Sequence, residues 1–211
     1  MFNFQEIADA LIAGNAKKVK ELTEQGVKEN ISPKDLLEKG LIAGMSVVGE
    51  HFKAGDCYIP DVLISARAMH AGMDILKPLL ANSNAQYAGK VVIGTVAGDL
   101  HDIGKNLVGM MLEGAGFQVI DLGIDVTPEK FVETSKTENA NIVAMSALLT
   151  TTMPPMKETI IALQNAGLKD KVKVMIGGAP ITQKFADQIG ADGFAVDAAT
   201  AADIAKKLVA H

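Results

Sequence analysis

The second half of the chain alternates between short apolar runs and segments with helix-start signals, and this alternation limits the possible folds more than any other feature. The runs are apolar along their whole length, which is typical of parallel strands that helices cover on both faces. We therefore predict an α/β domain with a flavodoxin-like (Rossmann-type) five-stranded parallel sheet over residues 89–211. Its strands are expected at residues 90–96, 118–122, 142–146, 173–176 and 193–196, and its helices after Gly104, Thr127-Pro128, Pro154-Pro155, Thr182 and Ala199.

Residues 1–86 follow a different pattern, because their apolar residues recur at helical spacing. Ser32 and Pro33 are an N-cap and a first-turn proline, and Gly55-Asp56 interrupts the pattern before a last helix that starts at Pro60-Asp61. Four helices with short connections predict a four-helix bundle, and the small polar residues 81–86 predict a linker. The inward positions are expected to be Ile7, Leu11, Ile12, Val19, Leu22, Val27, Leu36, Leu37, Leu41, Met45, Val62, Leu63, Ala66, Met69 and Met73.

Composition and charge exclude several classes of protein. The formal net charge is −5 and no stripe of Lys and Arg is present, which disfavours a nucleic-acid partner. Cys57 is the only cysteine, so an internal disulfide and a cysteine-based metal site are excluded. The first residues lack the basic start of a signal peptide, and no apolar run has membrane-spanning length. We expect a soluble, cytoplasmic protein with no membrane partner.

A carboxylate and an imidazole stand two residues apart directly after the first predicted strand. Residues i and i+2 of an extended segment point the same way, so Asp99 is placed to accept a hydrogen bond from one nitrogen of His101. The other nitrogen is then free for a metal. A carboxylate behind a ligating histidine fixes its tautomer and raises its basicity. A lone histidine is more often structural, but the neighbouring Asp99 favours a ligand role for His101.

The ends of the other strands bring hydroxyls and glycines to the same edge of the sheet, where such sheets bind ligands. The third strand ends at Ser146-Ala147-Leu148 and is followed by a threonine-rich segment at residues 149–152, and the fourth ends at Gly177-Gly178. Glycine pairs let a ligand approach the main chain, which indicates a large ligand with a narrow tail. A flavin phosphate would need a Ser-, Thr- or Gly-rich loop, but two aspartates stand in the loop before the first helix of this domain.

Three of these features together resemble the cobalamin-binding signature. Asp-x-His-x-x-Gly at residues 99–104 is followed after 41 residues by Ser-x-Leu at 146–148, and after 28 more by Gly177-Gly178. The helical region in front of it resembles the cap domain of methionine synthase and of the corrinoid proteins of methyltransferase systems. The resemblance covers essentially the whole chain, with a cap at residues 1–86 and a cobalamin-binding domain at residues 89–211. It is greatest to the small corrinoid proteins that serve methylamine, quaternary-amine, methanol or methoxyaromatic methyltransferases.

The resemblance implies a role for each motif residue. His101 would be the lower axial ligand of cobalt, and Asp99 and Thr152 would form a proton relay behind it, with threonine where methionine synthase has serine. A proton gained by the relay would favour the reduced metal, and a proton lost would favour the methylated form. The further cofactor contacts implied are Asp102, Ile103, Gly104, Leu148 and Thr150, then Ser146, Gly177 and Gly178 at the nucleotide tail, and Tyr58 from the cap.

The function implied is that of a methyl-carrying corrinoid subunit rather than a complete enzyme. Its cofactor would be cobalamin or a related corrinoid, in methylated form. Its partners would be a substrate:corrinoid methyltransferase, a second methyltransferase acting on a folate or thiol acceptor, and a reductive activation protein. The alternative is the cobalamin-binding subunit of an adenosylcobalamin-dependent mutase, in which the helical cap would have no purpose. A cobalamin-dependent regulator would need a DNA-binding element, which the sequence does not show.

Overall fold

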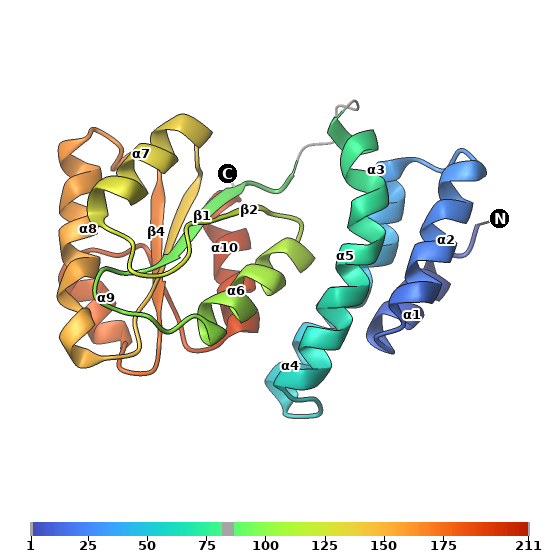
Figure 1. The fold of residues 1–211 in the computed structure, drawn as a ribbon, viewed down its shortest axis with the longest axis horizontal. Coiled ribbons are helices and arrows are strands. Elements are labelled where there is room, and N and C mark those ends of the chain that lie inside the picture. The colour runs from blue at the N-terminus through green and yellow to red at the C-terminus, as the bar shows by residue number, and fades with distance from the viewer. Residues whose placement is uncertain (1, 82–86, 211) are drawn as a thin grey trace. The chain divides into compact units, whose positions relative to one another are not determined.

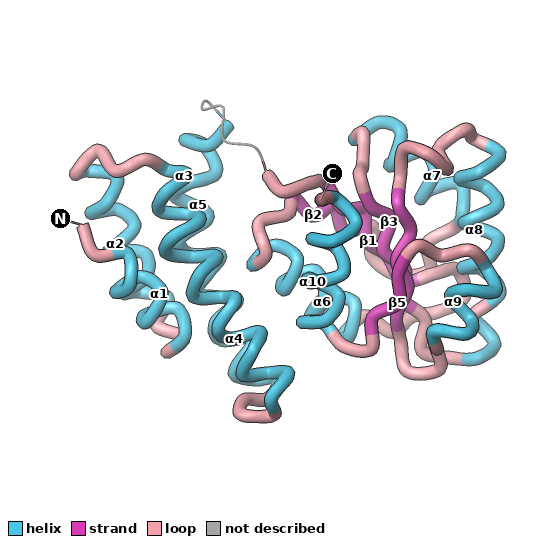
Figure 2. Tube along the Cα trace, turned by 180° about the vertical axis from the view of Figure 1, so that it is seen from behind, coloured by secondary structure: helices cyan, strands magenta, loops and turns pink. Residues whose placement is uncertain are grey.

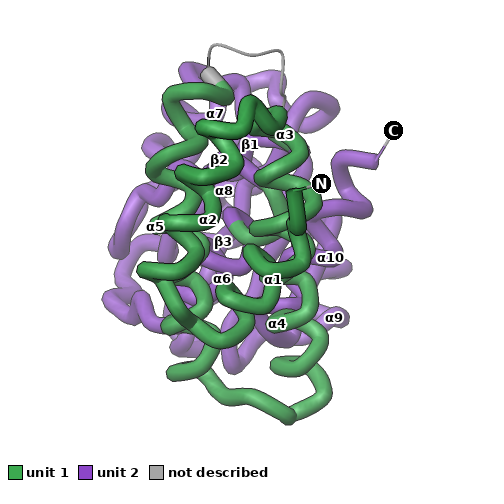
Figure 3. The backbone as a smooth tube through the Cα atoms, turned by 90° about the vertical axis from the view of Figure 1, so that its right-hand side faces the viewer, with its two compact units in different colours: residues 1–87, 114–116 green, residues 88–113, 117–211 purple. Residues whose placement is uncertain are grey.

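The computed structural model describes residues 2–81 and 87–210. The chain divides into two compact units, residues 1–87 with 114–116 and residues 88–113 with 117–211 (Figure 3). Of the predicted linker, residues 82–86 lie outside the described residues. None of the helices in the described ranges combines the length and the apolar character that a membrane span requires.

The second unit is a five-stranded sheet with helices on both faces (Figures 1 and 2). All neighbouring strands are parallel, in the order β2-β1-β3-β4-β5. This is the predicted flavodoxin-like topology, in which the strand order reverses between β1 and β3. The strands are β1 (Lys90–Thr95), β2 (Gln118–Asp121), β3 (Ile142–Ser146), β4 (Lys173–Gly177) and β5 (Gly193–Ala195). The helices are α6 (Ile103–Gly114), α7 (Pro128–Glu138), η2 (Thr150–Thr152), α8 (Pro154–Asn165), α9 (Gln183–Ile189) and α10 (Ala198–Val209).

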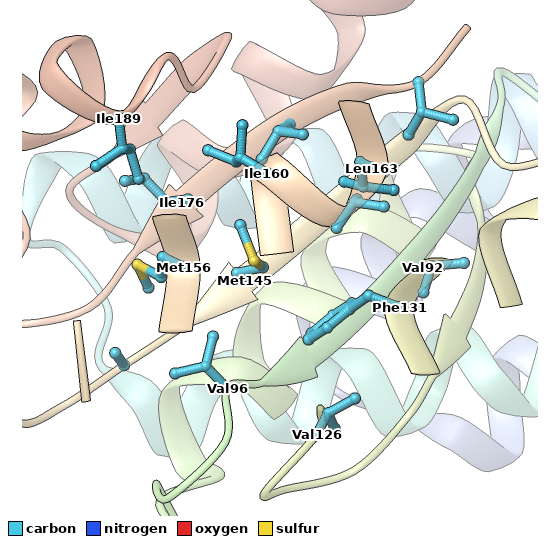
Figure 4. Close-up of a cluster of buried hydrophobic side chains, with 14 of the residues drawn as sticks. Val92, Val96, Val126, Phe131, Met145, Met156, Ile160, Leu163, Ile176 and Ile189 are labelled. Carbon is cyan, nitrogen blue, oxygen red and sulfur yellow. The ribbon is translucent and has the colours of Figure 1, made fainter. Parts of the chain in front are cut away.

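Buried apolar side chains, most of them aliphatic, fill the space between the sheet and helices α7, α8 and α9 (Figure 4). Val92 of β1 and Met145 of β3 belong to this cluster, together with Phe131 of α7 and Met156 of α8. Helices α6 and α10 cover the opposite face of the sheet (Figure 1). Because both faces are covered, successive residues of the central strands β1, β3 and β4 are buried, which explains the apolar runs in these strands.

The predicted elements differ from the observed ones only near their ends. Strand β1 ends at Thr95, and Val96 forms a single bridge with Val126. Helix α10 begins before Ala199, because the Oδ1 atom of Asp197 accepts a hydrogen bond from the main-chain nitrogen of Thr200 at 2.7 Å and caps the helix. The positions of the caps, more than the apolar pattern, therefore set where these helices start.

The first unit contains the four predicted helical segments. Pro33 lies in the first turn of the third segment as predicted, but the side chain of Ser32 makes no capping hydrogen bond. Leu63, predicted to face inward, is exposed, whereas most of the other predicted positions are buried. The segments are α1 (Phe4–Ile12), α2 (Ala16–Lys28), the continuous run of α3 (Pro33–Asp35), π-helical η1 (Leu36–Ile42) and α4 (Ala43–Ala54), and α5 (Ile59–Ala81).

Candidate functional site

Asp99 and His101 lie in the loop between β1 and α6, at the carboxyl end of β1. The hydrogen bond predicted between them is present, with 2.7 Å between His101 Nδ1 and Asp99 Oδ1. The predicted cause is wrong, because the strand ends at Thr95 and the pair is not part of it. The main-chain nitrogen of His101 also donates to Asp99 Oδ1, at 3.1 Å. This side-chain turn, rather than strand alternation, brings the imidazole onto the carboxylate.

Asp99 is fully buried, and its second oxygen is surrounded by donors. Oδ2 accepts hydrogen bonds from Thr152 Oγ1 at 2.6 Å and from the main-chain nitrogens of Leu148 at 2.8 Å and Leu149 at 3.4 Å. Burial by itself raises the pKa of Asp99, but the hydrogen bonds from Thr152, Leu148 and His101 outweigh it and hold the pKa well below its ordinary value. Asp99 is therefore ionised at neutral pH.

The ionised carboxylate determines the tautomer of His101. Nδ1 must carry the hydrogen that it donates to Asp99, so Nε2 of the neutral ring has a free lone pair. The main chain of His101 is held by Thr95, whose Oγ1 donates to the His101 carbonyl oxygen at 2.8 Å. The side chain of His101 is 51% exposed, whereas that of Asp99 is 0% exposed. The imidazole is thus fixed on one side and open to a ligand on the other.

The segment after β3 contributes Thr152 but not Thr150 to this group. The buried Thr152 hydroxyl lies within reach of both Asp99 Oδ2 and the Leu149 carbonyl oxygen, the latter at 2.9 Å. Its one hydrogen goes to the carboxylate, which is the nearer acceptor and carries a charge. Thr150 is exposed at the start of η2 and takes no part in the hydrogen bonds to Asp99 described above.

A row of small residues crosses the sheet at the carboxyl ends of its strands. Thr95 pairs in register with Ser146, Ser146 with Gly177, and Gly177 with Ala195. These residues alternate with those of the core cluster, so their side chains point to the sheet face that α6 and α10 cover. Ser146 and Gly177, predicted from separate motifs, are therefore neighbours on one face.

Gly177 ends β4 and Gly178 follows it, and glycine is present at these two positions for different physical reasons. Gly178 has a φ of +130°, and a Cβ atom there would lie 1.9 Å from the carbonyl oxygen of Ala147. The crossing of two loops thus requires glycine at position 178. A Cβ atom on Gly177 would lie 3.0 Å from the Ala195 carbonyl oxygen, so this residue also keeps the row of small side chains narrow.

Asp102 directly precedes helix α6, and Ile103 and Gly104 are its first residues. Asp102 Oδ2 accepts a hydrogen bond from the side-chain nitrogen of Asn106 at 3.2 Å, and Ile103 is exposed. A Cβ atom on Gly104 would meet no other atom within 4 Å. Since neither packing nor backbone conformation requires glycine at position 104, the space beside the first turn of α6 is open to a ligand.

Large apolar side chains are exposed at the same edge of the sheet, and most of them were missed in the sequence. They lie in the loops that follow β1, β2, β3 and β5 or, for Ile103, at the start of α6, and they follow no periodic pattern. Exposed apolar groups that a fold brings together mark binding surfaces. The exposed residues are Leu100, Ile103, Ile124, Leu148, Leu149 and Val196.

A buried cation near the start of α6 was also missed. Lys105 forms an ion pair with Asp121 at the end of β2, and its Nζ donates to Asn106 Oδ1 at 2.7 Å. The side chain of Lys105 is 2% exposed and that of Asp121 is 46% exposed. Because Asn106 also bonds to Asp102, this network ties the first turn of α6 to β2.

Tyr58 belongs to the first unit and directly precedes α5. Its main-chain nitrogen donates to Asp61 Oδ2 at 2.8 Å, which caps the helix. Its side chain is exposed, and so are those of Ile59 and Leu63. The first unit therefore has its own exposed apolar group at this helix start.

Comparison with known proteins gives matches over nearly the whole chain. Two family models, both described as a B12 binding domain, match residues 89–205 and residues 4–77. The dimethylamine corrinoid protein of Methanosarcina barkeri is 46% identical over 207 residues, covering 98% of this chain and 97% of that protein. A corrinoid protein of Desulfitobacterium hafniense is 44% identical over 207 residues, covering 97% and 96%.

Two solved structures have similar folds. A cobalamin-binding protein from Desulfitobacterium hafniense superposes with a TM-score of 0.82 at 34% identity, covering 99% of both chains. A chain of the methanol:cobalamin methyltransferase complex from Methanosarcina barkeri superposes with a TM-score of 0.86 at 34% identity, covering 98% of this chain and 79% of that chain.

Proposed function

The chain belongs to the B12-binding corrinoid proteins of methyltransferase systems, and from this premise we propose that it carries a methyl group on the cobalt of a bound corrinoid. When bound, the corrinoid supplies a cobalt that accepts a methyl group and gives it up again. One observation carries the proposal. His101 has Nδ1 fixed by a buried, ionised carboxylate and Nε2 free at the edge of the sheet where ligands bind.

The residues at this edge fit a corrinoid in three respects. The imidazole of His101 is a suitable cobalt ligand, the exposed apolar side chains suit a large macrocycle, and the row of small residues suits a narrow tail. We assign the tail contacts to Ser146 and Gly177, and assign Gly178 to the loop crossing that holds them. The contacts to the macrocycle are assigned to Asp102, Ile103, Gly104, Leu148 and Thr150.

Asp99 and Thr152 hold a proton in place on His101. Since several hydrogen bonds stabilise the Asp99 anion, the shared proton stays on His101 Nδ1. A second proton taken up by the pair would go to Nε2 and would remove the lone pair that binds the metal. Proton uptake and metal binding by His101 therefore oppose each other. This is the coupling that the Asp-x-His spacing suggested.

The partners follow from the role of a carrier. A substrate-specific methyltransferase of the methylamine or methanol type would load the methyl group, as the names of the relatives suggest. A second methyltransferase would pass it to a folate or thiol, and a reductive activation protein would restore the reduced cobalt. We propose that residues 1–86 act as a cap whose Tyr58 shields the methyl group, and that the chain works in the cytoplasm.

The proposal is tested by reconstitution with cobalamin. The full chain and its His101→Ala variant are loaded, and visible and EPR spectra are recorded with protein labelled with 15N at histidine. Label-dependent nitrogen splitting of the cob(II)alamin signal in the wild type, lost in His101→Ala, is the expected result. His51→Ala, which replaces another exposed histidine, is the matched control and should keep the splitting. Wild-type protein that binds cobalamin without this splitting would contradict the proposal.

The mutase alternative is separated from the carrier by activity. The relatives named above are corrinoid proteins and a chain of a methyltransferase complex, which favours the carrier. The loaded protein is mixed with methyltransferases of the methylamine and methanol type, and methyl transfer from donor to protein is measured. Rearrangement of a carbon skeleton with adenosylcobalamin, in place of methyl transfer, would favour the mutase.

A further inference from the structure

Asp125, in the loop between β2 and α7, has an unusual main-chain conformation and holds the loop that carries Asp99. Its φ is +53°, in the left-handed region that L-residues rarely adopt. Its Oδ1 accepts a hydrogen bond from the main-chain nitrogen of Gly98 at 2.7 Å. Its own main-chain nitrogen donates to the carbonyl oxygen of Asp99 at 3.1 Å. Residue 125 thus bonds to the peptide units on either side of the Gly98–Asp99 pair, 97–98 and 99–100, in the β1–α6 loop.

These two hydrogen bonds extend a longer contact that the β2–α7 loop makes with β1 and the loop after it. The main-chain nitrogen of Leu122 donates to the carbonyl oxygen of Ile93 at 2.8 Å, and that of Val126 donates to the carbonyl oxygen of Thr95 at 2.9 Å. The β2–α7 loop therefore runs beside β1 beyond the end of β2. We call the two hydrogen bonds of Asp125 the clasp. Among the hydrogen bonds named for this contact, only the one to Asp125 Oδ1 has a side-chain acceptor.

The choice of aspartate at position 125 has a physical reason. Glycine would adopt the left-handed conformation at lower cost, and asparagine and aspartate tolerate it better than other residues. Of these three residue types, only asparagine and aspartate have a side-chain oxygen that can accept from the nitrogen of Gly98. Gly98 itself has a φ of +80°. The residue that fits the conformation and also supplies the acceptor is the one present. A left-handed residue beside a binding loop is typical of a site that must be held in one geometry.

We propose that Asp125 is a positioning residue for the metal ligand. It fixes the main chain of Gly98 and Asp99, so that the Asp99 carboxylate meets His101 Nδ1 and directs Nε2 toward the cofactor. This inference rests on the proposed function, because it concerns how His101 reaches a corrinoid. It adds a residue outside the Asp-x-His-x-x-Gly, Ser-x-Leu and Gly-Gly motifs.

Two substitutions separate the hydrogen bond from the conformation. Asp125→Gly keeps the left-handed conformation and removes the acceptor, whereas Asp125→Asn keeps both. We expect Asp125→Gly to bind cobalamin about threefold to tenfold more weakly, the factor that one partly solvated hydrogen bond supplies. It should also show a smaller fraction of imidazole-bound cob(II)alamin in the EPR spectrum. Asp125→Asn should restore both to near the wild-type values.

Asn139 provides a matched control. It also has a left-handed conformation, with a φ of +52°, but it lies at the end of α7. Asn139→Gly makes the same change in main-chain freedom without touching the clasp, and it should leave cobalamin affinity and the EPR spectrum unchanged. If Asn139→Gly weakens binding as much as Asp125→Gly, the effect is general destabilisation and the inference is overturned.

A measurement without cofactor tests the clasp directly. Hydrogen exchange at the amide of Gly98 should be faster in Asp125→Gly than in the wild type or Asp125→Asn, because its acceptor is gone. If Asp125→Gly has the same cobalamin affinity and EPR spectrum as the wild type, the inference is overturned and the proposed function is left intact. Wild-type protein that binds no corrinoid would instead overturn the proposed function, and the inference with it.

Discussion

Thr152→Val is the sharpest test of how the protein stabilises the Asp99 anion. Valine keeps the shape of the buried side chain and removes the hydroxyl that donates to Asp99 Oδ2 at 2.6 Å. A hydrogen bond to a charged group contributes about 1.5–3 kcal/mol, and about 1.4 kcal/mol corresponds to one pKa unit. Since the Leu148 amide and His101 continue to donate, we expect the pKa of Asp99 to rise by about one. The free energy of unfolding of the α/β part of the chain should fall by about 2 kcal/mol at neutral pH.

The pH dependence has a definite sign. The pKa of Asp99 in the folded protein is lower than in the unfolded chain, so the ionised group stabilises the fold above the unfolded pKa of about 4. This contribution is lost as the pH falls through the folded pKa. The difference between Thr152→Val and the wild type should therefore be constant from about pH 8 to about pH 5 and should shrink only in stronger acid.

The assay is carboxyl NMR of the full chain labelled with 13C at aspartate, which reports both the titration of Asp99 and the unfolding of its surroundings in urea. The matched control is Thr159→Val, because Thr159 is also buried but its hydroxyl donates to the neutral Pro155 carbonyl oxygen at 2.8 Å. It should cost about 1 kcal/mol and leave the pKa of Asp99 unchanged. Equal losses in Thr152→Val and Thr159→Val, with an unchanged Asp99 titration, would refute the reasoning.

Two further predictions concern the stability of the apo-protein in urea. Gly178→Ala should cost about 3 kcal/mol or more, because its Cβ would lie 1.9 Å from the Ala147 oxygen, whereas Gly190→Ala, with a φ of +76° and open space, should cost about 1 kcal/mol. Asp121→Ala should cost about 3 kcal/mol and Lys105→Met about 1 kcal/mol, because the first leaves a buried ammonium without its carboxylate and the second leaves a carboxylate that water reaches. Equal costs within either pair would contradict the explanation.

The sheet was predictable because its central strands β1, β3 and β4 are buried on both faces. These three strands consist mainly of apolar residues, and several helices have a start signal such as Thr127 before Pro128. The exact ends were not predictable from the runs. Val96 is as apolar as the strand before it, yet the chain turns there because Gly98 and Asp99 bond to the loop at Asp125.

Only those parts of the candidate site that consist of side-chain contacts were predictable from the sequence. The spacing of Asp99 and His101 indicated their hydrogen bond, although a local turn causes it. The donors to the other carboxylate oxygen include the main-chain nitrogen of Leu148, 49 residues away. A main-chain donor has no sequence signature, because every residue except proline has one. The same holds for Asp125, whose role depends on a conformation that the residue type permits but does not specify.

The environment of the pair explains why its two members differ so much in exposure. Asp99 is buried and surrounded by hydrogen-bond donors. Its charge and the proton on His101 Nδ1 are therefore insensitive to a ligand at His101 Nε2. The ring of His101 is half exposed, so its Nε2 is accessible to a ligand. If the carboxylate were as exposed as the ring, solvent would compete for both hydrogen bonds and the tautomer would no longer be fixed. The buried acid therefore gives the exposed base a single direction of donation, which is the arrangement that the proposed metal-binding role of His101 would need.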